Sequence, residues 1–213
     1  TYTTGAFYPN VKPMKKVRIS ATWSAVTYRL FTGFVESWPQ DWPGNRDGVV
    51  EITATDGFKV FSLKKISGVS AKITGTADNG SGLIRLEAKG HGATTGDVLV
   101  VADVAGTTEA NGSWTVTSVD PDHIDLQSST WTNTYLGGGT IAKYATQLSS
   151  ARITQVLDEI SWLAADRSLD TGISTLQPTG YSKADALSIL QQIEQTENGR
   201  LFIKADGALR FDN

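Results

Sequence analysis

The residues that could bind a metal ion form one short acidic cluster. Asp120, Asp122, His123 and Asp125 lie close together in the sequence, and carboxylates and imidazoles are common metal ligands. The cluster matches a calcium-binding loop only in part, because it lacks the glycine and the later bidentate glutamate of such a loop. The other histidine, His91, is too distant in sequence to form a local pair with His123. We therefore predict a polar turn at this cluster and no metal site.

Covalent catalysis and phosphate binding lack their usual motifs. The chain has no cysteine, no Gly-x-Ser-x-Gly motif, and only two histidines from which a serine–histidine–acid triad could be built. The glycines 137–139 precede neither Lys-Ser/Thr nor a helix, so we interpret them as a hairpin turn. Glu36, Asp41 and Asp47 border a tryptophan-rich loop, as the paired carboxylates of a glycoside hydrolase could. Their separation cannot be read from one sequence, so we predict no catalytic residue, no cofactor and no enzyme.

Aromatic side chains are the other candidates for a binding function. Trp38 and Trp42 enclose a turn with two prolines, where exposed indoles could contact a partner or a sugar. Alternatively, these rings fold back and close the end of a barrel, which the large area that an indole buries favours. Trp131 and Tyr135 lie in or next to a turn-rich stretch and are the candidates for contact with a glycan.

Charge is unevenly distributed along the chain. Its 213 residues carry 19 Lys/Arg and 22 Asp/Glu, for a net charge of −3. Residues 1–66 carry +4, residues 67–145 carry −4 and residues 146–213 carry −3. The positive charges are dispersed and do not alternate with aromatic residues, so we predict no recognition of nucleic acid. No apolar run reaches the ~18 residues of a membrane span, and no signal peptide is recognisable.

The same three zones differ in their secondary-structure pattern. Alternating residues in the first zone predict four strands, at 16–20, 27–32, 34–38 and 49–55. Gly33 interrupts the middle pair, which suggests a bulge or a sharp bend. The second zone is rich in Gly, Thr, Ser and Val, and it predicts a small barrel or sandwich with strands at 83–88, 98–101, 114–119, 123–127 and 140–144.

The third zone predicts two helices and a hairpin. The first helix begins at Ser149 or Ser150, and the second runs from Ser182 to Asn198-Gly199. Residues 205–207 then join two strands, at 200–204 and 208–212.

The domain organisation follows from the likeness of the first and third zones. We expect one discontinuous domain, 1–66 with 146–213, that carries 67–145 as an inserted β domain, because surface loops tolerate long insertions. The predicted fold class is mainly β with an α+β C-terminal part. The chain starts without Met and ends directly after a strand, so we expect it to be a piece of a longer protein.

Parts of the first and third zones resemble a known family. They include Phe7-Tyr8-Pro9-Asn10-Val11, Val17-Arg18-Ile19, Leu30-Phe31-Thr32-Gly33-Phe34-Val35-Glu36-Ser37-Trp38, Val50–Asp56 and the helix from Ser150 to Trp162. This pattern resembles the tail-hub or minor tail proteins of long-tailed bacteriophages.

The second zone resembles a separate module. Residues 91–98, 110–116 and 135–141 are similar to a small β domain that recurs in phage tail proteins. That module resembles the first catalytic-cysteine half-domain of ubiquitin-activating enzymes. Because this chain has no cysteine, the resemblance implies no ubiquitin-type activity.

The tail-hub resemblance implies a β-barrel hub domain in a ring, usually a trimer, at the tail tip of the virion. Its partners would be other phage tail proteins, since the hub joins the tail tube to fibres or receptor binders. We expect subunit contacts at unpaired strand edges and at Trp38, Trp42, Phe31 and Phe34. The alternative function is a carbohydrate-binding module that holds a host-surface glycan with Trp131 and Tyr135.

Overall fold

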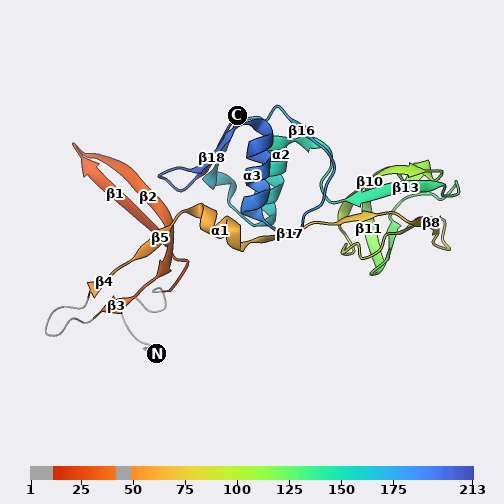
Figure 1. Cartoon of the computed structure of the whole chain (residues 1–213), viewed down its shortest axis with the longest axis horizontal. Helices are drawn as coiled ribbons and strands as arrows, with labels where there is room; N and C mark the ends of the chain where they lie inside the picture. Colours follow the sequence, from red (N-terminus) through yellow and green to blue (C-terminus); the bar gives the residue numbers. More distant parts are fainter. Residues whose placement is uncertain (1–11, 42–48) are drawn as a thin grey trace. The chain divides into compact units, whose positions relative to one another are not determined.

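The computed structural model describes residues 12–41 and 49–213, and the chain is mainly β. It divides into two compact units (Figure 1). The first comprises the chain up to Lys64, Val156–Thr171 and Asp185–Asn213, and the second comprises Lys65–Gln155 and Gly172–Ala184. Residues 67–145 lie within the second unit. Their predicted role as an insertion, and the predicted boundaries at 66 and 146, stay predictions.

The first unit contains a three-stranded sheet with a long hairpin. Its strands are β1 (Lys16–Trp23), β2 (Val26–Ser37) and β5 (Thr53–Thr55), in the order β1-β2-β5. Because β5 pairs only with the end of β2, the outer half of the β1–β2 hairpin has no third strand among the described residues (Figure 1). Ser24 and Ala25 close the hairpin with φ of 46° and 63°, as a two-residue type I′ turn requires. A short pair, β3 (Gln40–Asp41) and β4 (Val49–Val50), lies apart from this sheet.

The expected break at Gly33 is wrong. Strand β2 runs continuously through Gly33, which pairs with Val17, and the irregularities lie elsewhere, opposite Ile19/Ser20 and at Val35/Ser37. A Cβ at position 33 would lie 2.2 Å from the carbonyl oxygen of Thr55 and 2.4 Å from the ring of Phe31. The glycine therefore makes room for a close approach and does not bend the strand.

Two helices and a second small sheet complete the first unit. Helix α1 (Gly57–Leu63) is capped by Asp56, and α3 (Ala186–Glu197) is capped by Asp185. The sheet has the order β15-β19-β18, from β15 (Arg167–Leu169), β18 (Arg200–Ile203) and β19 (Leu209–Asp212), after a 3₁₀ turn at Ala164–Asp166. The predicted hairpin at 200–212 is confirmed, as is the end of the second helix at Asn198, whose φ is 55°.

The predicted start of that helix at Ser182 is wrong. Residues Ser182–Asp185 form strand β17, which pairs with β6 (Lys65–Ser67). The Asp185 carboxylate accepts hydrogen bonds from the backbone N–H and the hydroxyl of Ser188, so the helix begins only after Asp185.

The core of the first unit is aromatic and aliphatic. The rings of Trp162 and Phe61 pack edge-on with their centroids 4.7 Å apart, and the centroid of the Trp162 ring lies 6.3 Å from that of Phe34. The other buried side chains of the first unit come from β2, the end of helix Ser149–Glu159 and the turn after it, α3 and the second sheet: Val35, Val156, Leu157, Ile160, Ile189, Leu190, Ile193, Leu201, Leu209 and Phe211.

The second unit contains a seven-stranded sheet that curls into a half-barrel. Its order is β7-β13-β10-β11-β12-β9-β8, and its strands are β7 (Ser70–Lys72), β8 (Gly75–Asp78), β9 (Ile84–Glu87), β10 (Val98–Ala105), β11 (Gly112–Asp120), β12 (His123–Leu126) and β13 (Gly137–Ala142). Strands are present at all five places where the sequence predicted them, and β7 and β8 are additional. The core inside the curl is aliphatic, with Ile84, Leu86, Leu99, Val116, Ile124, Leu126 and Ile141 fully or almost fully buried.

The remaining elements are a 3₁₀ turn, a short strand pair and a helix whose residues up to Gln155 belong to the second unit and from Val156 to the first. A 3₁₀ turn spans Thr108–Ala110, and β14 (Gln147–Leu148) pairs with β16 (Thr175–Leu176). Helix α2 (Ser149–Glu159) starts at the predicted serine. No helix within residues 12–41 and 49–213 combines the length and the apolar character that crossing a membrane requires.

Candidate functional site

The predicted subunit-contact residues do not form one surface. Phe34 faces Trp162 in the core of the first unit, and Trp38 is half-buried and donates its Nε1–H to the carbonyl of Lys12 at 2.9 Å. Phe31 pairs with Ile19, three residues from Phe34 along a regular stretch of β2, so it lies on the opposite face. Trp42 lies outside the described residues. Of the three that are described, only Phe31 is on a face that remains uncovered in the hairpin.

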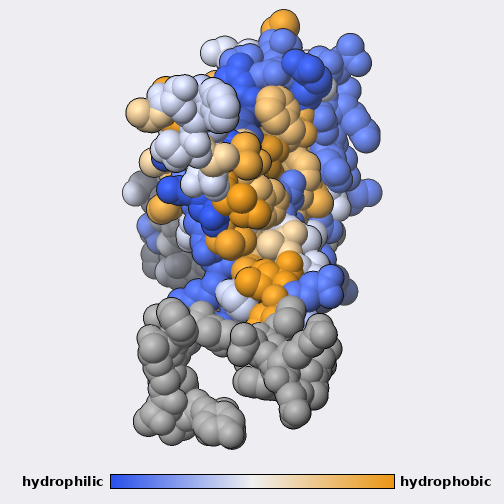
Figure 2. Space-filling model, turned by 90° about the vertical axis from the view of Figure 1, so that its left-hand side faces the viewer, coloured by the Kyte–Doolittle hydropathy of each residue, from blue (hydrophilic) through white to orange (hydrophobic). Residues whose placement is uncertain are grey.

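That face is apolar and exposed. Alternation along β1 places Ile19, Ala21 and Trp23 on one side, and the register adds Val26, Tyr28 and Leu30 from β2. We call these six side chains, together with Phe31, the hairpin apolar face. Trp23 is 76% exposed and Leu30 is 58% exposed, and Ile19, Val26 and Tyr28 are each about half exposed. Figure 2 views the molecule from the side where β1 and β2 lie in Figure 1, and hydrophobic side chains gather there in a band.

The opposite face of the hairpin is polar. Thr22 and Thr27 form a directly opposed pair whose hydroxyl oxygens are 3.1 Å apart, and Arg18, Ser20 and Arg29 lie on the same side. From Lys12 to Val35 the chain carries five Lys/Arg and no Asp/Glu. The hairpin therefore combines an apolar face with a purely positive charge.

The predicted glycan-contact residues are partly used within the second unit. Trp131 and Tyr135 are half-buried, and both rings pack against the aliphatic core. The Tyr135 hydroxyl lies within hydrogen-bond distance of the carbonyl oxygens of Ile73 and Gly138. Each ring thus keeps only one part exposed, and contact with a glycan stays a prediction.

Glu109 organises the loop between these two rings, a role that the sequence did not indicate. Its carboxylate accepts hydrogen bonds from the backbone N–H and the hydroxyl of Thr132 and from the backbone and side-chain N–H groups of Asn133. Partial burial acts to raise the pKa of Glu109, but the hydrogen bonds from Thr132 and Asn133 outweigh it and lower the pKa to about 2. The loop is therefore fixed by a permanently ionised carboxylate at neutral pH.

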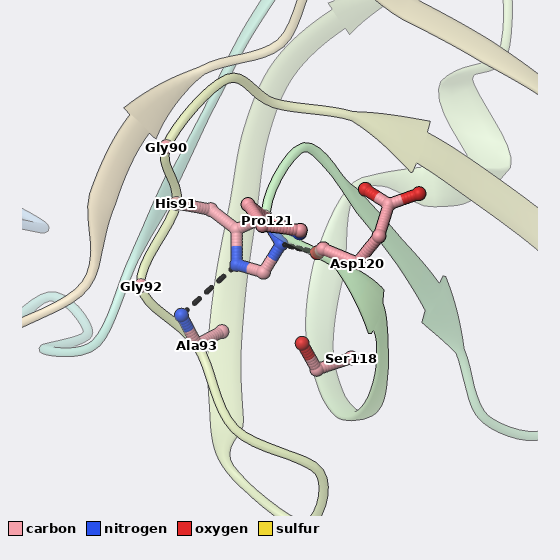
Figure 3. A pocket seen from close by; sticks show the side chains of 7 residues that line it. All are labelled: Gly90, His91, Gly92, Ala93, Ser118, Asp120 and Pro121. Carbon is pink, nitrogen blue, oxygen red and sulfur yellow. Dashed lines mark hydrogen bonds between the residues drawn. The ribbon is translucent and has the colours of Figure 1, made fainter.

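A shallow hollow of about 510 Å³ lies between the glycine-rich loop before β10 and the β11–β12 turn (Figure 3). It is lined by Gly90, His91, Gly92, Ala93, Ser118, Asp120 and Pro121. The buried imidazole of His91 accepts a hydrogen bond from the Ala93 N–H at Nδ1, so Nε2 is assigned as the donor to the carbonyl of Asp120. His91 thus holds the two walls of the hollow together, and Figure 3 shows its ring between them.

Asp120 stands at the edge of this hollow and organises the turn that the acidic cluster predicted. Its carboxylate accepts hydrogen bonds from the backbone N–H groups of Asp122 and His123 and from the ring of His123. The Asp122 N–H is the largest influence on the pKa of Asp120; with the His123 contacts it outweighs burial and holds the pKa below its usual range. In the described ranges, no three His, Asp or Glu side chains form a group that could hold a metal ion.

The fourth residue of the cluster belongs to a different arrangement. Asp125 accepts two hydrogen bonds from the guanidinium of Arg85, at 2.6 and 2.9 Å, and a third from Asn79. Arg85, Glu87 and His123 border a second hollow of about 150 Å³, whose far side is formed by Gly75, Thr76 and Ala77. Arg85 therefore neutralises the negative charge of Asp125, and that carboxylate is not available to a ligand in the second hollow.

Comparisons with known proteins add no assignment: no family model matches the chain, and no curated protein matches it.

Proposed function

We propose that the chain is a non-enzymatic structural component of a bacteriophage tail tip, part of a hub that joins the tail tube to fibres or receptor-binding proteins. The proposal starts from the resemblance of residues 30–38, 50–56 and 150–162 to tail-hub proteins. In it, residues 1–66 with 146–213 form the hub domain and residues 67–145 are its insertion. The hub is a homo-oligomeric ring, a trimer in the proteins that the chain resembles.

The hairpin apolar face is the observation that carries the proposal. A two-stranded hairpin is at best marginally stable alone in water, and large contiguous apolar patches on soluble proteins mark interaction sites. Trp23, Tyr28 and Leu30 are each more than half exposed on this face. In an assembly subunit, a neighbouring protein would cover the apolar face of this hairpin and so stabilise it.

The free edge of the same hairpin supports an assembly role. Strand β1 is the outer strand of its sheet, so its backbone N–H and C=O groups on one side lack a strand partner within the described residues. Unpaired edges recruit strands from other chains. The subunit contacts that we propose are therefore this edge and the hairpin apolar face, with Phe31 at its inner end.

Immunogold electron microscopy tests the proposal. Antibodies against the chain should label tail tips of virions whose genome encodes it, and mass spectrometry should find the chain in purified virions. Labelling of capsids, or absence from purified virions, contradicts the tail-tip role. A zymogram with host peptidoglycan should remain without clearing, and clearing would favour a hydrolase.

A carbohydrate-binding function remains a second candidate because Glu109 fixes the loop that bears Trp131. A preorganised aromatic ring binds a sugar with little loss of conformational entropy. Trp131→Ala should then abolish binding to a glycan array while the thermal unfolding profile remains cooperative. The absence of any binding by the unmodified chain at millimolar glycan removes this candidate.

A further inference from the structure

Three asparagines of the chain are directly followed by glycine: Asn79, Asn111 and Asn198. In such a pair the backbone nitrogen of the glycine can attack the side-chain carboxamide of the asparagine, because glycine has no Cβ to hinder the approach. The attack requires the carboxamide to rotate toward that nitrogen, so hydrogen bonds that hold the carboxamide slow the reaction. The three pairs differ in how firmly the fold holds this group.

The carboxamides of Asn79 and Asn111 are both held by hydrogen bonds. The side-chain oxygen of Asn79 accepts from two backbone N–H groups of its own loop, at 2.8 and 3.2 Å, and its NH₂ group donates to Asp125 at 3.0 Å. The Asn111 carboxamide forms a closed pair with the backbone of Val104, accepting from its N–H at 2.9 Å and donating to its carbonyl at 3.0 Å. Neither carboxamide can rotate without breaking at least two of these bonds.

Asn198 lies at the end of α3 and has a different environment. Its side chain is exposed, and no hydrogen bond of its carboxamide occurs within residues 12–41 and 49–213. The nitrogen that would attack it, that of Gly199, donates to the carbonyl of Glu194 at 3.1 Å in the last turn of the helix. The corresponding nitrogen of Gly80 is also hydrogen-bonded, to the carboxylate of Asp78 at 2.7 Å. Because helix ends open at little cost in free energy, the Gly199 nitrogen is released easily.

We propose that Asn198 is a deamidation site of the folded protein. The backbone nitrogen of Gly199 forms a bond to the side-chain carbonyl carbon of Asn198, and the proton of that nitrogen leaves with the NH₂ group as ammonia. The product is a five-membered succinimide. Water then adds to one of its two carbonyl carbons and opens the ring, to aspartate or to isoaspartate, in which the backbone runs through the side-chain carbon. This modification is independent of the proposed tail-tip role.

Either product would disturb the junction of α3 and β18. Aspartate at position 198 places a negative charge at the C-terminal end of α3, directly after Glu197, and the helix dipole disfavours negative charge there. Isoaspartate lengthens the backbone by one atom directly before Gly199, where even a Cβ would lie 2.5 Å from the carbonyl oxygen of Asp212 and 3.1 Å from the ring of Phe211. Deamidation should therefore destabilise the first unit.

Substitutions at the junction test this effect on stability. Asn198→Gly removes the carboxamide and suits the left-handed conformation, so it should stay unmodified and keep the thermal unfolding midpoint. Asn198→Asp is the mimic of the aspartate product and should lower the midpoint without incubation. Gln191→Glu, at an exposed position in the middle of α3, adds the same charge away from the helix end and is the matched control. A midpoint that Asn198→Asp leaves unchanged would overturn the expected effect on the junction.

Incubation of the whole chain at mildly alkaline pH, followed by tryptic digestion and mass spectrometry, tests the site itself. The tryptic peptides 73–85, 90–143 and 184–200 each carry one of the three pairs, so their conversion is measured in one sample. Asn198 should convert about tenfold faster than Asn79 or Asn111, because no side-chain hydrogen bond has to break first. In urea the three rates should converge. Conversion of Asn79 or Asn111 as fast as Asn198 in the folded chain, or an Asn198 that converts only in urea, overturns the proposal.

Discussion

The guanidinium carbon of Arg152 lies 5.0 Å from the centre of the Tyr144 ring, and both side chains are fully buried. Arg152 also donates hydrogen bonds to the carbonyls of Ala145 and Gln177 and to the hydroxyl of Tyr181. Three separate stretches of the second unit are thus held by one side chain. These partners are two carbonyl oxygens, a hydroxyl and an aromatic face.

Replacement of Arg152 should strongly destabilise the chain. Arg152→Ala removes the donor to the carbonyls of Ala145 and Gln177 and opens a cavity where a fully buried side chain was, so we expect a loss of about 3 kcal/mol or more in the free energy of unfolding. Urea unfolding followed by circular dichroism measures it. Arg200→Ala is the control, because Arg200 is largely exposed and its contact with Asp212 should contribute less than about 1 kcal/mol. Equal losses in the two variants would contradict the role given to Arg152.

The two histidines should respond differently to the same substitution. His91→Leu removes the donor to the Asp120 carbonyl and the acceptor of the Ala93 N–H in a buried site, which should cost about 2–4 kcal/mol of unfolding free energy. His123→Leu removes only a partly exposed contact with Asp120 and should cost less than about 1 kcal/mol. Denaturant titrations of both variants give the comparison. A His91→Leu chain as stable as the unmodified one would show that the walls of the hollow do not need the imidazole.

Glu109 should make stability depend on acid pH. Its pKa is lowered from 4.5 in the unfolded chain to about 2 in the folded one. The stabilisation is therefore complete above about pH 4.5 and is lost as the pH falls toward 2. In Glu109→Gln, the midpoint of thermal unfolding should be lower than in the unmodified chain near neutral pH, and the difference should shrink through this window. Ser113→Ala, at an exposed position of β11, is the control and should keep the pH profile of the unmodified chain.

A single methyl group should test the close approach at Gly33. Gly33→Ala places a Cβ 2.2 Å from the Thr55 carbonyl oxygen, so β5 has to move away from β2. We expect a loss of about 1–3 kcal/mol, typical of overpacking, and faster amide exchange at the β2–β5 pairs. Ser20→Ala, at an exposed position of β1, should change neither quantity. Unchanged exchange in Gly33→Ala would mean that the added Cβ is accommodated without loosening the β2–β5 pairs.

Segments with a strongly periodic apolar pattern were predictable from the sequence. The errors in predicted secondary structure arose at residues that often break a strand or start a helix. The apolar spacing after Ser149 and the turn at 205–207 predicted α2 and the last hairpin. Glycine commonly interrupts strands, so Gly33 suggested a break. Its structural role is to leave room for the Phe31 ring and the Thr55 carbonyl, and no local sequence pattern reveals these neighbours. Ser182 and Asp185 are both good capping residues, and only the strand pairing of 182–185 decides between them.

The candidate surfaces were predictable only in part. Alternation from Ile19 to Leu30 shows which side of the hairpin is apolar, but a period of two does not show whether another element covers it. Glu109 and Arg152 carried no signal, because their partners lie 23 and 25 residues away in the sequence. Contacts between residues so far apart in the sequence depend on the tertiary fold, which local secondary-structure propensity does not determine.

The division into two interleaved units has a consequence for synthesis on the ribosome. Neither unit is one continuous stretch: the first needs Asp185–Asn213, and the second needs Gly172–Ala184. A growing chain translated as far as residue 150 therefore holds a complete hairpin and half-barrel sheet but lacks α3, β18 and β19, whose buried side chains complete the first core. Folding of the first unit is then a late event, and the nascent chain exposes this core to chaperones and proteases until residues 186–213 have left the ribosome.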